Sequence, residues 1–116
     1  MSLLEKYETA LENGDVKTLE NLLHDEFTFV PHVGDAVMKK SHVLAFAGTG
    51  AVRSEGNRIL YENDEIGVSH SIVHFTNGST SEAVLSFVRF KDGKIFSMET
   101  GATPLSDDYK LIGSES

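Results

Sequence analysis

The N-terminal residues alternate between apolar and charged positions at helical spacing. The apolar side chains fall on one side of a helix: Leu3, Leu4, Tyr7 and Leu11. The charged side chains fall on the other: Glu5, Lys6, Glu8 and Glu12. This pattern predicts a helix over residues 2–12. Asn13-Gly14 provides a stop, and Asp15 is placed to cap a second helix whose apolar side carries Val16, Leu19, Leu22 and Leu23.

The pattern changes to β-forming residues over 27–30, and Pro31 ends regular pairing there. We expect a short strand. After the loop that contains Gly34, Ser41 is placed to cap a third helix, which stops at Gly48. The apolar residues of this helix are Val43, Leu44, Phe46 and Ala47.

The second half of the chain has the pattern of a strand meander. The predicted strands are 58–62, 66–76, 82–90 and 94–101. They are joined by Asn63-Asp64, Asn77-Gly78 and Asp92-Gly93, and such pairs tolerate the positive φ that tight hairpins require. Helices first and strands after predict an α+β fold, with N-terminal helices packed on a curved antiparallel sheet.

Along residues 83–90 both alternating sets of side chains are mainly apolar. Water therefore covers neither face of this predicted strand. One face meets the helices, and the other needs a partner. We expect a homodimer through the outer face of the sheet, with Leu85 and Phe87 at or near the interface.

Composition fits one globular domain over residues 1–116, with 40% hydrophobic and 24% charged residues and a polar stretch over 106–116 that we expect to be a loosely ordered tail. The net charge of −8 argues against nucleic acid, because it would repel a phosphate backbone. No apolar run is long enough to cross a bilayer and there is no secretory signal pattern, so we expect a cytoplasmic protein without membrane contact. The sequence has no cysteine, which excludes thiolate chemistry and cysteine-ligated metals.

The order of these elements carries a family resemblance. A helix, Gly14-Asp15, a second helix, the segment 24–29, Gly34, a third helix and long hairpins ending in 93–95 follow one another. This order resembles the nuclear-transport-factor-two-like superfamily over residues 3–105, within it the SnoaL-like group and the ketosteroid isomerase branch. The resemblance implies a cone-shaped, cystatin-like fold that encloses a pocket. Its members include isomerases, cyclases, dehydratases and domains without chemistry, so activity does not follow from the fold.

Ketosteroid isomerase uses an aspartate base, with a tyrosine and a protonated aspartic acid as the oxyanion hole. The alignment on Gly14-Asp15 brings Tyr7 onto the tyrosine. It places Pro31 at the position of the base and Ser86 at the position of the acid. Two of the three groups are missing, which argues against steroid isomerisation by that mechanism.

Histidines are the remaining candidates for acid–base chemistry. His32 lies one residue from the aligned base position, so it is the best candidate for a proton acceptor, with Tyr7 as donor; the alternative is a loop histidine that faces solvent. His70 and His74 share a face of their strand, which the resemblance implies is the pocket face. They start roughly 13 Å apart, too far to bind one metal ion, so we predict no metal site. His24 and His42 have the positions of helix-end residues.

The expected pocket is mainly apolar. Its expected wall consists of Phe27, Phe29, Phe46, Val84, Val88, Met98 and Thr100. The candidate ligand-binding residues are Tyr7, Phe29, Phe46, His70, His74, Ser86, Val88, Met98 and Thr100. We further predict that Tyr7, Phe29, Ser86 and Met98 converge on one cavity. Such a wall suits a small hydrophobic molecule. The leading hypothesis is ligand binding without a cofactor; the alternatives are a cofactor-independent isomerase, cyclase or dehydratase using His32 and Tyr7, and a non-catalytic dimerisation or protein-interaction module.

Overall fold

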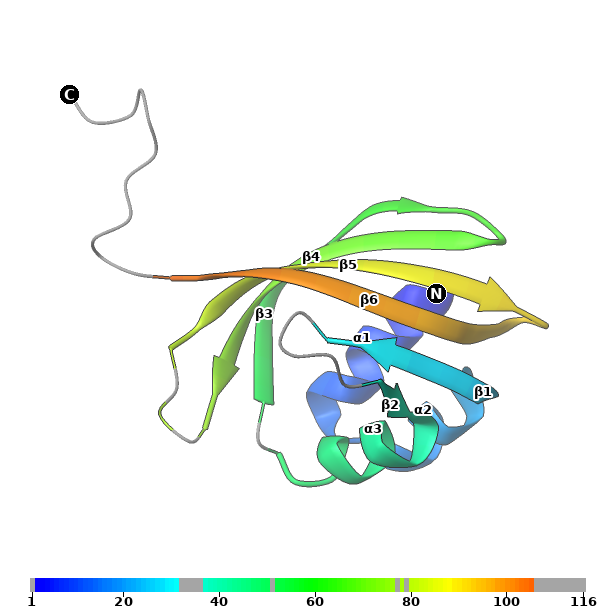
Figure 1. The fold of residues 1–116 in the computed structure, drawn as a ribbon, viewed down its shortest axis with the longest axis horizontal. Helices are drawn as coiled ribbons and strands as arrows, with labels where there is room; N and C mark the ends of the chain where they lie inside the picture. Colours follow the sequence, from blue (N-terminus) through cyan, green and yellow to red (C-terminus); the bar gives the residue numbers. More distant parts are fainter. Residues whose placement is uncertain (1, 32–36, 51, 77, 79, 106–116) are drawn as a thin grey trace.

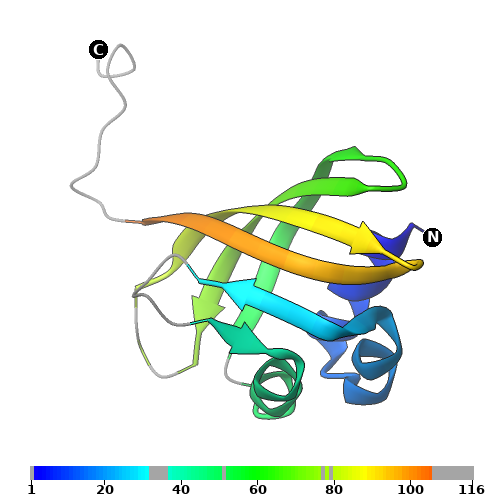
Figure 2. The same ribbon diagram turned by 45° about the vertical axis from the view of Figure 1, so that its right-hand side comes forward.

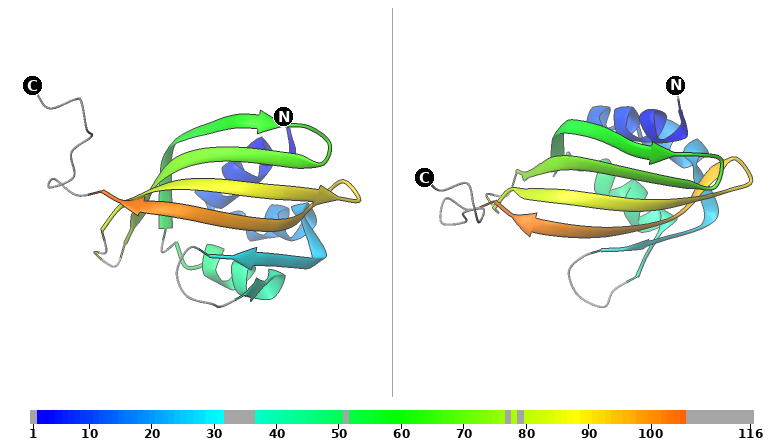
Figure 3. Two further views of the ribbon diagram at one scale, coloured as in Figure 1. Left: turned by 45° about the horizontal axis from the view of Figure 1, so that its top comes forward. Right: turned by 90° about the horizontal axis from the view of Figure 1, so that it is seen from above.

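The computed structural model describes residues 2–31, 37–50, 52–76, 78 and 80–105 (Figure 1). The helices of this part are α1 Leu3–Asn13, α2 Val16–Leu22 and α3 Lys40–Ala47. Its strands are β1 Leu23–Val30, β2 Met38–Lys39, β3 Val52–Glu62, β4 Ile66–Phe75, β5 Glu82–Lys91 and β6 Lys94–Pro104. The helices pack on one face of a curved sheet, so the predicted α+β architecture is confirmed (Figures 1 and 3).

The strands form one sheet in the order β2-β1-β6-β5-β4-β3 (Figure 2). The sheet is mixed and not antiparallel throughout, because β1 runs parallel to β6. The hairpin signals in the sequence concern antiparallel neighbours that are joined by short turns. β1 meets β6 without such a turn, since it enters from the helical layer, and no local signal announces this pairing.

The first two helices begin and end as the sequence predicts. Ser2 caps α1 in a capping box with Glu5, and Gly14 closes it in the left-handed conformation at φ 63°. Asp15 caps α2 by accepting from the amide of Thr18 at 3.2 Å. α2 then passes directly into β1 at Leu23, so β1 starts four residues before the predicted strand.

The third helix starts earlier than predicted, and Ser41 does not cap it. Lys39 is the N-cap residue, and its amide donates to Nδ1 of His42 at 3.1 Å. His42 therefore lies in the first turn of α3. His24 does not end a helix either, because the chain is already extended there in β1.

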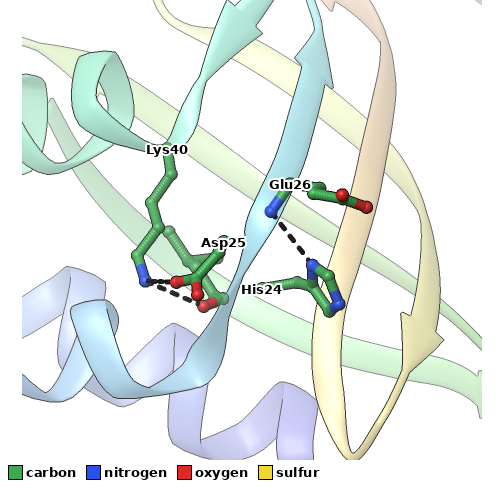
Figure 4. A network of polar contacts seen from close by, with 5 residues as sticks. His24, Asp25, Glu26 and Lys40 are labelled. Carbon is green, nitrogen blue, oxygen red and sulfur yellow. Dashed lines mark hydrogen bonds and ion pairs between the residues drawn. The ribbon is translucent and has the colours of Figure 1, made fainter.

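A polar network joins the start of α3 to β1 (Figure 4). Lys40 Nζ donates to the Leu23 carbonyl at 3.1 Å and to Asp25 Oδ1 at 3.2 Å. On the other side of β1, His24 Nδ1 accepts from the Glu26 amide at 3.0 Å, and its Nε2 contacts Asp92 Oδ2 at 3.2 Å. The Lys40 ammonium lowers the pKa of the Asp25 carboxyl.

The predicted hairpins are present, and β3 is longer than expected. Asp92 and Gly93 have φ of 56° and 73°, as the tight β5-β6 turn requires. β3 starts at Val52, and its register with β4 shifts between Glu55 and Arg58, around Gly56 at φ 61°. An irregularity of this kind breaks the alternation that a sequence pattern needs.

The core lies between α1, α2, β1 and the helix-covered face of the sheet. Its fully buried side chains are Leu4, Leu19, Leu23, Phe27, Val88 and Ile95. Leu4 packs on Gly67, where an added Cβ would lie 2.6 Å from Leu4 Cδ1. On β5, Val84 and Val88 point into the core, whereas Leu85 and Phe87 on the other face are 49% and 37% exposed.

Candidate functional site

Hydroxyl side chains form a row across the helix-covered face of the sheet. Ser69 of β4 pairs directly with Ser86 of β5, and Ser86 pairs with Thr100 of β6. Residues that pair directly in a sheet point to the same face, and Ser69 is buried on the helix side. The row therefore combines three hydroxyl groups from three strands on this face.

An apolar row lies on one side of these hydroxyls, and a mixed row with one further hydroxyl, that of Ser71, lies on the other. One row is Gly67, Val88, Met98 and Phe29, which are cross-strand partners in that order. The other contains Val84, between Ser71 and Ala102. Ser86 thus lies on the face that we expected, with Val84 and Val88 beside it. The helix-covered face alternates apolar surface with a line of hydroxyl groups.

Tyr7 lies on the buried side of α1, next to this face of the sheet. Its side chain is buried, and its hydroxyl donates to Met98 Sδ at a distance of 4.0 Å, which makes a weak hydrogen bond. Burial, and then the negative charge of Glu8, raise the pKa of Tyr7 to about 12. The phenol therefore stays protonated at neutral pH and is a hydrogen-bond donor.

Glu8 is the functional candidate that sequence reasoning missed. The helical pattern was interpreted with Glu8 on the solvent side of α1, but it is half-buried against the sheet. Burial raises the pKa of its carboxyl, a hydrogen bond with Ser69 opposes that shift, and the charges of Glu62 and Glu5 add to it. The sequence contains a sign of this burial, because Leu4, Glu8 and Leu11 are spaced i, i+4 and i+7 and so lie on one side of the helix.

Glu62 at the end of β3 contributes a second carboxyl near Glu8. Its Oε2 accepts a long hydrogen bond of 3.5 Å from the Leu4 amide. Its Oε1 is buried and has no hydrogen-bond partner. Mutual repulsion between the two carboxylates favours a proton on Glu8. The end of the hydroxyl row thus meets a carboxyl group that is able to exchange a proton.

The two strand histidines lie on the opposite face from the expected one. His70 and His74 share a face with Ile66, Val68 and Ile72, as predicted, but His70 pairs with the outward-facing Leu85. The sequence prediction therefore assigned the two faces of β4 the wrong way round: the face with Ser69, and not the face with His70, meets the helices. His74 instead contacts Glu55 and Ser81. The candidate base His32 lies outside the described residues.

Two hollows on the described surface are lined by residues other than Tyr7, Phe29, Ser86 and Met98. The larger has a volume of about 760 Å³, between the N-terminus of α1 and the β3-β4 turn, and Glu62 is among its lining residues. The smaller, of about 350 Å³, lies between the C-termini of α1 and α3 and the start of β3. Phe46 lines this smaller hollow and is 44% exposed, so it is not part of the wall formed with Met98.

Within residues 2–31, 37–50, 52–76, 78 and 80–105, no group of three or more His, Asp or Glu side chains is arranged to hold a metal ion. None of the helices there is long and apolar enough to cross a membrane.

Three helices packed on a curved mixed sheet define the NTF2-like, or cystatin-like, class of α+β folds. The chain belongs to the SnoaL-like domain family, whose model matches residues 4–98. No curated protein matches the chain.

Solved structures agree with this class. An NTF2-like protein of unknown function from Cytophaga hutchinsonii ATCC 33406 has a TM-score of 0.75 and 16% identity, over 88% of each chain. An NTF-2 like protein of unknown function from Burkholderia xenovorans LB400 has a TM-score of 0.72 and 15% identity, over 96% of this chain and 85% of that one. An LEH-like epoxide hydrolase of M. tuberculosis has a TM-score of 0.66 and 17% identity, over 87% and 80%. At such identities the likeness concerns the fold alone.

Proposed function

We propose that this SnoaL-like domain binds a small, largely apolar molecule that carries a carbonyl or hydroxyl group, on the helix-covered face of the sheet. The observation that carries the proposal is the row Ser69, Ser86 and Thr100 with the apolar residues Val88 and Met98 on one side and Val84 on the other. Apolar surface supplies affinity through burial, and a few placed polar groups supply orientation. Tyr7, with a hydroxyl that has only a weak sulfur partner at 4.0 Å, adds a donor at the edge of this face.

Native mass spectrometry of the purified protein tests this proposal. A copurifying small molecule that is released on unfolding is the expected result, and Ser86→Ala should reduce its occupancy. Ser97→Ala is the matched control, because Ser97 pairs with Arg89 on the other face of the same strand pair. Equal occupancy in the two variants would contradict the assignment of the binding face.

A catalytic version of this proposal rests on Glu8. Its carboxyl has a raised pKa and a hydrogen bond with Ser69, so it is suited to accept or return a proton near the hydroxyl row. Tyr7 stays protonated and is suited to stabilise a developing oxyanion. The reaction would be a cofactor-independent proton transfer or loss of water on a carbonyl compound, and Glu8 competes with His32 for the role of base. Turnover of the copurifying molecule that is lost in Glu8→Gln and kept in His32→Ala would assign the base to Glu8.

The outer face of the sheet supports a second proposal, a homodimer. Leu85 and Phe87 project there from β5, and Tyr61, Val68 and Phe87 are cross-strand neighbours on that face. Tyr61 is 57% exposed. A continuous exposed apolar patch of this kind marks an interaction surface. A second copy of the chain is the partner that we propose.

A further inference from the structure

Ser81, His74 and Glu55 form a hydrogen-bonded relay on the outer side of the β3-β4-β5 sheet region. His74 Nδ1 lies 2.6 Å from Ser81 Oγ, and His74 Nε2 lies 2.8 Å from Glu55 Oε1. Both ring nitrogens are therefore engaged. The three side chains come from separate segments: β3, β4 and the residue that precedes β5.

The partners fix the tautomer of a neutral His74. A carboxylate only accepts hydrogen bonds, so Nε2 carries the proton that Glu55 accepts. Nδ1 then has a free lone pair, and the Ser81 hydroxyl donates to it. This is the order of groups that activates a serine: an oriented imidazole acts as base toward the hydroxyl, and a carboxylate orients the imidazole.

The backbone holds each member of the relay in place. Leu105 N donates to the Ser81 carbonyl at 2.8 Å, which fixes the entry to β5. The register of β3 with β4 shifts directly after Glu55, and such an irregularity changes the direction of side chains on a strand. Arg53 of β3 is the direct cross-strand partner of His74, which sets the position of the His74 backbone in the sheet.

Within a single chain the relay is accessible from solvent, and His74 lies four residues along β4 from His70, the cross-strand partner of the proposed interface residue Leu85. The side chain of His74 is 36% exposed, and Ser81 is partly buried. Because the relay lies on the face away from the helices, it is separate from the hydroxyl row and from the ligand-binding proposal. We propose that Ser81 is a nucleophile that accepts an acyl group from small activated esters, with His74 as the base and Glu55 as a positioning residue.

The step balances without a cofactor. Ser81 Oγ attacks the ester carbonyl carbon while its proton moves to His74 Nδ1. The C–O bond to the alcohol then breaks, and the proton on Nδ1 passes to the departing oxygen. Water attacks the acyl-serine with Nδ1 again as the base, which releases the acid and returns the proton to Ser81.

The test uses the full chain and p-nitrophenyl acetate, with release of p-nitrophenolate and the position of the acetyl group, from peptide mass spectrometry, as readouts. We expect acetylation of Ser81. It should be lost in Ser81→Ala and fall about 10²-fold or more in His74→Gln, the scale of a lost general base. His70→Gln is the matched control, since His70 shares the face of β4 with His74, and it should react like the unmodified chain.

The positioning role of Glu55 is tested by the tautomer of His74, a property that a loss of packing alone would not change. Nitrogen-detected NMR of the His74 ring should show a proton on Nε2 in the unmodified chain and a mixture of tautomers in Glu55→Ala. Acetylation that stays on lysines or the N-terminus, equal acetylation of Ser81 in His74→Gln and His70→Gln, or a proton on Nδ1 of the neutral ring would each overturn the proposal. Circular dichroism of every variant verifies that it is folded.

Discussion

Tyr7 and Met98 are 91 residues apart in sequence, and the Tyr7 hydroxyl lies 4.0 Å from the Met98 sulfur. This contact joins α1 to β6 and places a protonated phenol beside the hydroxyl row. Tyr7 therefore has two roles: its ring packs α1 against the sheet, and its hydroxyl is a donor beside the proposed binding face.

Tyr7 should make stability fall at alkaline pH. Its pKa is raised from 10.0 to about 12 in the folded protein, so the folded state holds this proton more tightly than the unfolded state does. The stabilisation is complete below pH 10 and is lost as pH rises through about 12. Urea unfolding at pH 9 and pH 12 measures it, on the order of 3 kcal/mol for a shift of this size. Tyr7→Phe should remove that part of the pH dependence; an unchanged dependence would contradict the buried phenol.

Gly67→Ala should destabilise the fold. The new Cβ would lie 2.6 Å from Leu4 Cδ1 and 3.0 Å from Phe90 Cζ, so both must move. We expect a loss of about 1–3 kcal/mol in the free energy of unfolding, the usual cost of overpacking. Gly101→Ala is the control in the same sheet, because nothing lies within 4 Å of its Cβ position. Similar losses in the two variants would show that Leu4 does not pack on Gly67 as described.

Glu8→Gln should raise the melting temperature at pH 7. The folded protein raises the pKa of this carboxyl, so its ionised form disfavours folding. In the unmodified chain, stability should therefore increase as pH falls through the raised pKa, and this increase should be absent in Glu8→Gln. Glu12→Gln, at an exposed position of α1, is the control. A lower melting temperature for Glu8→Gln at pH 7 would mean that the negative charge of Glu8 stabilises the fold.

Phe87→Asp should prevent the proposed dimer. A charge on the outer face would be buried without a partner in the interface, at a cost of several kcal/mol. Light scattering at micromolar concentration should give a dimer mass for the unmodified chain and a monomer mass for this variant. Phe46→Asp is the control, since Phe46 is 44% exposed on α3, on the other side of the sheet from Phe87. A monomer mass for the unmodified chain would refute the dimer.

Local signals predicted most of the fold. Ser2 with Glu5, Asp15, and the Asp92-Gly93 turn all act through bonds or φ angles within a few residues, so the sequence alone reveals them. The parallel pairing of β1 with β6 was not predictable in this way, because it joins segments roughly seventy residues apart without a turn.

The candidate site was predicted less well, for physical reasons. Ser86 and Met98 were assigned to the correct face through the aligned spacings of the family resemblance, since the local pattern of residues 83–90 is apolar on both faces. His70 and His74 were assigned to the wrong face, since both sides of β4 carry apolar residues and period two alone does not tell which side meets the helices. Glu8 was missed because a charged residue in a helix is ordinarily solvated.

The most direct test of the binding proposal compares acetophenone with ethylbenzene, which lacks the carbonyl oxygen. Methyl NMR titrations of Val84, Val88 and Met98 report on the helix-covered face, and Leu85 reports on the other. We predict that acetophenone shifts the first group and binds more tightly than ethylbenzene, and that Ser86→Ala removes this preference while Ser97→Ala keeps it. Shifts confined to Leu85, or no preference for the ketone in the unmodified chain, would contradict binding at the hydroxyl row.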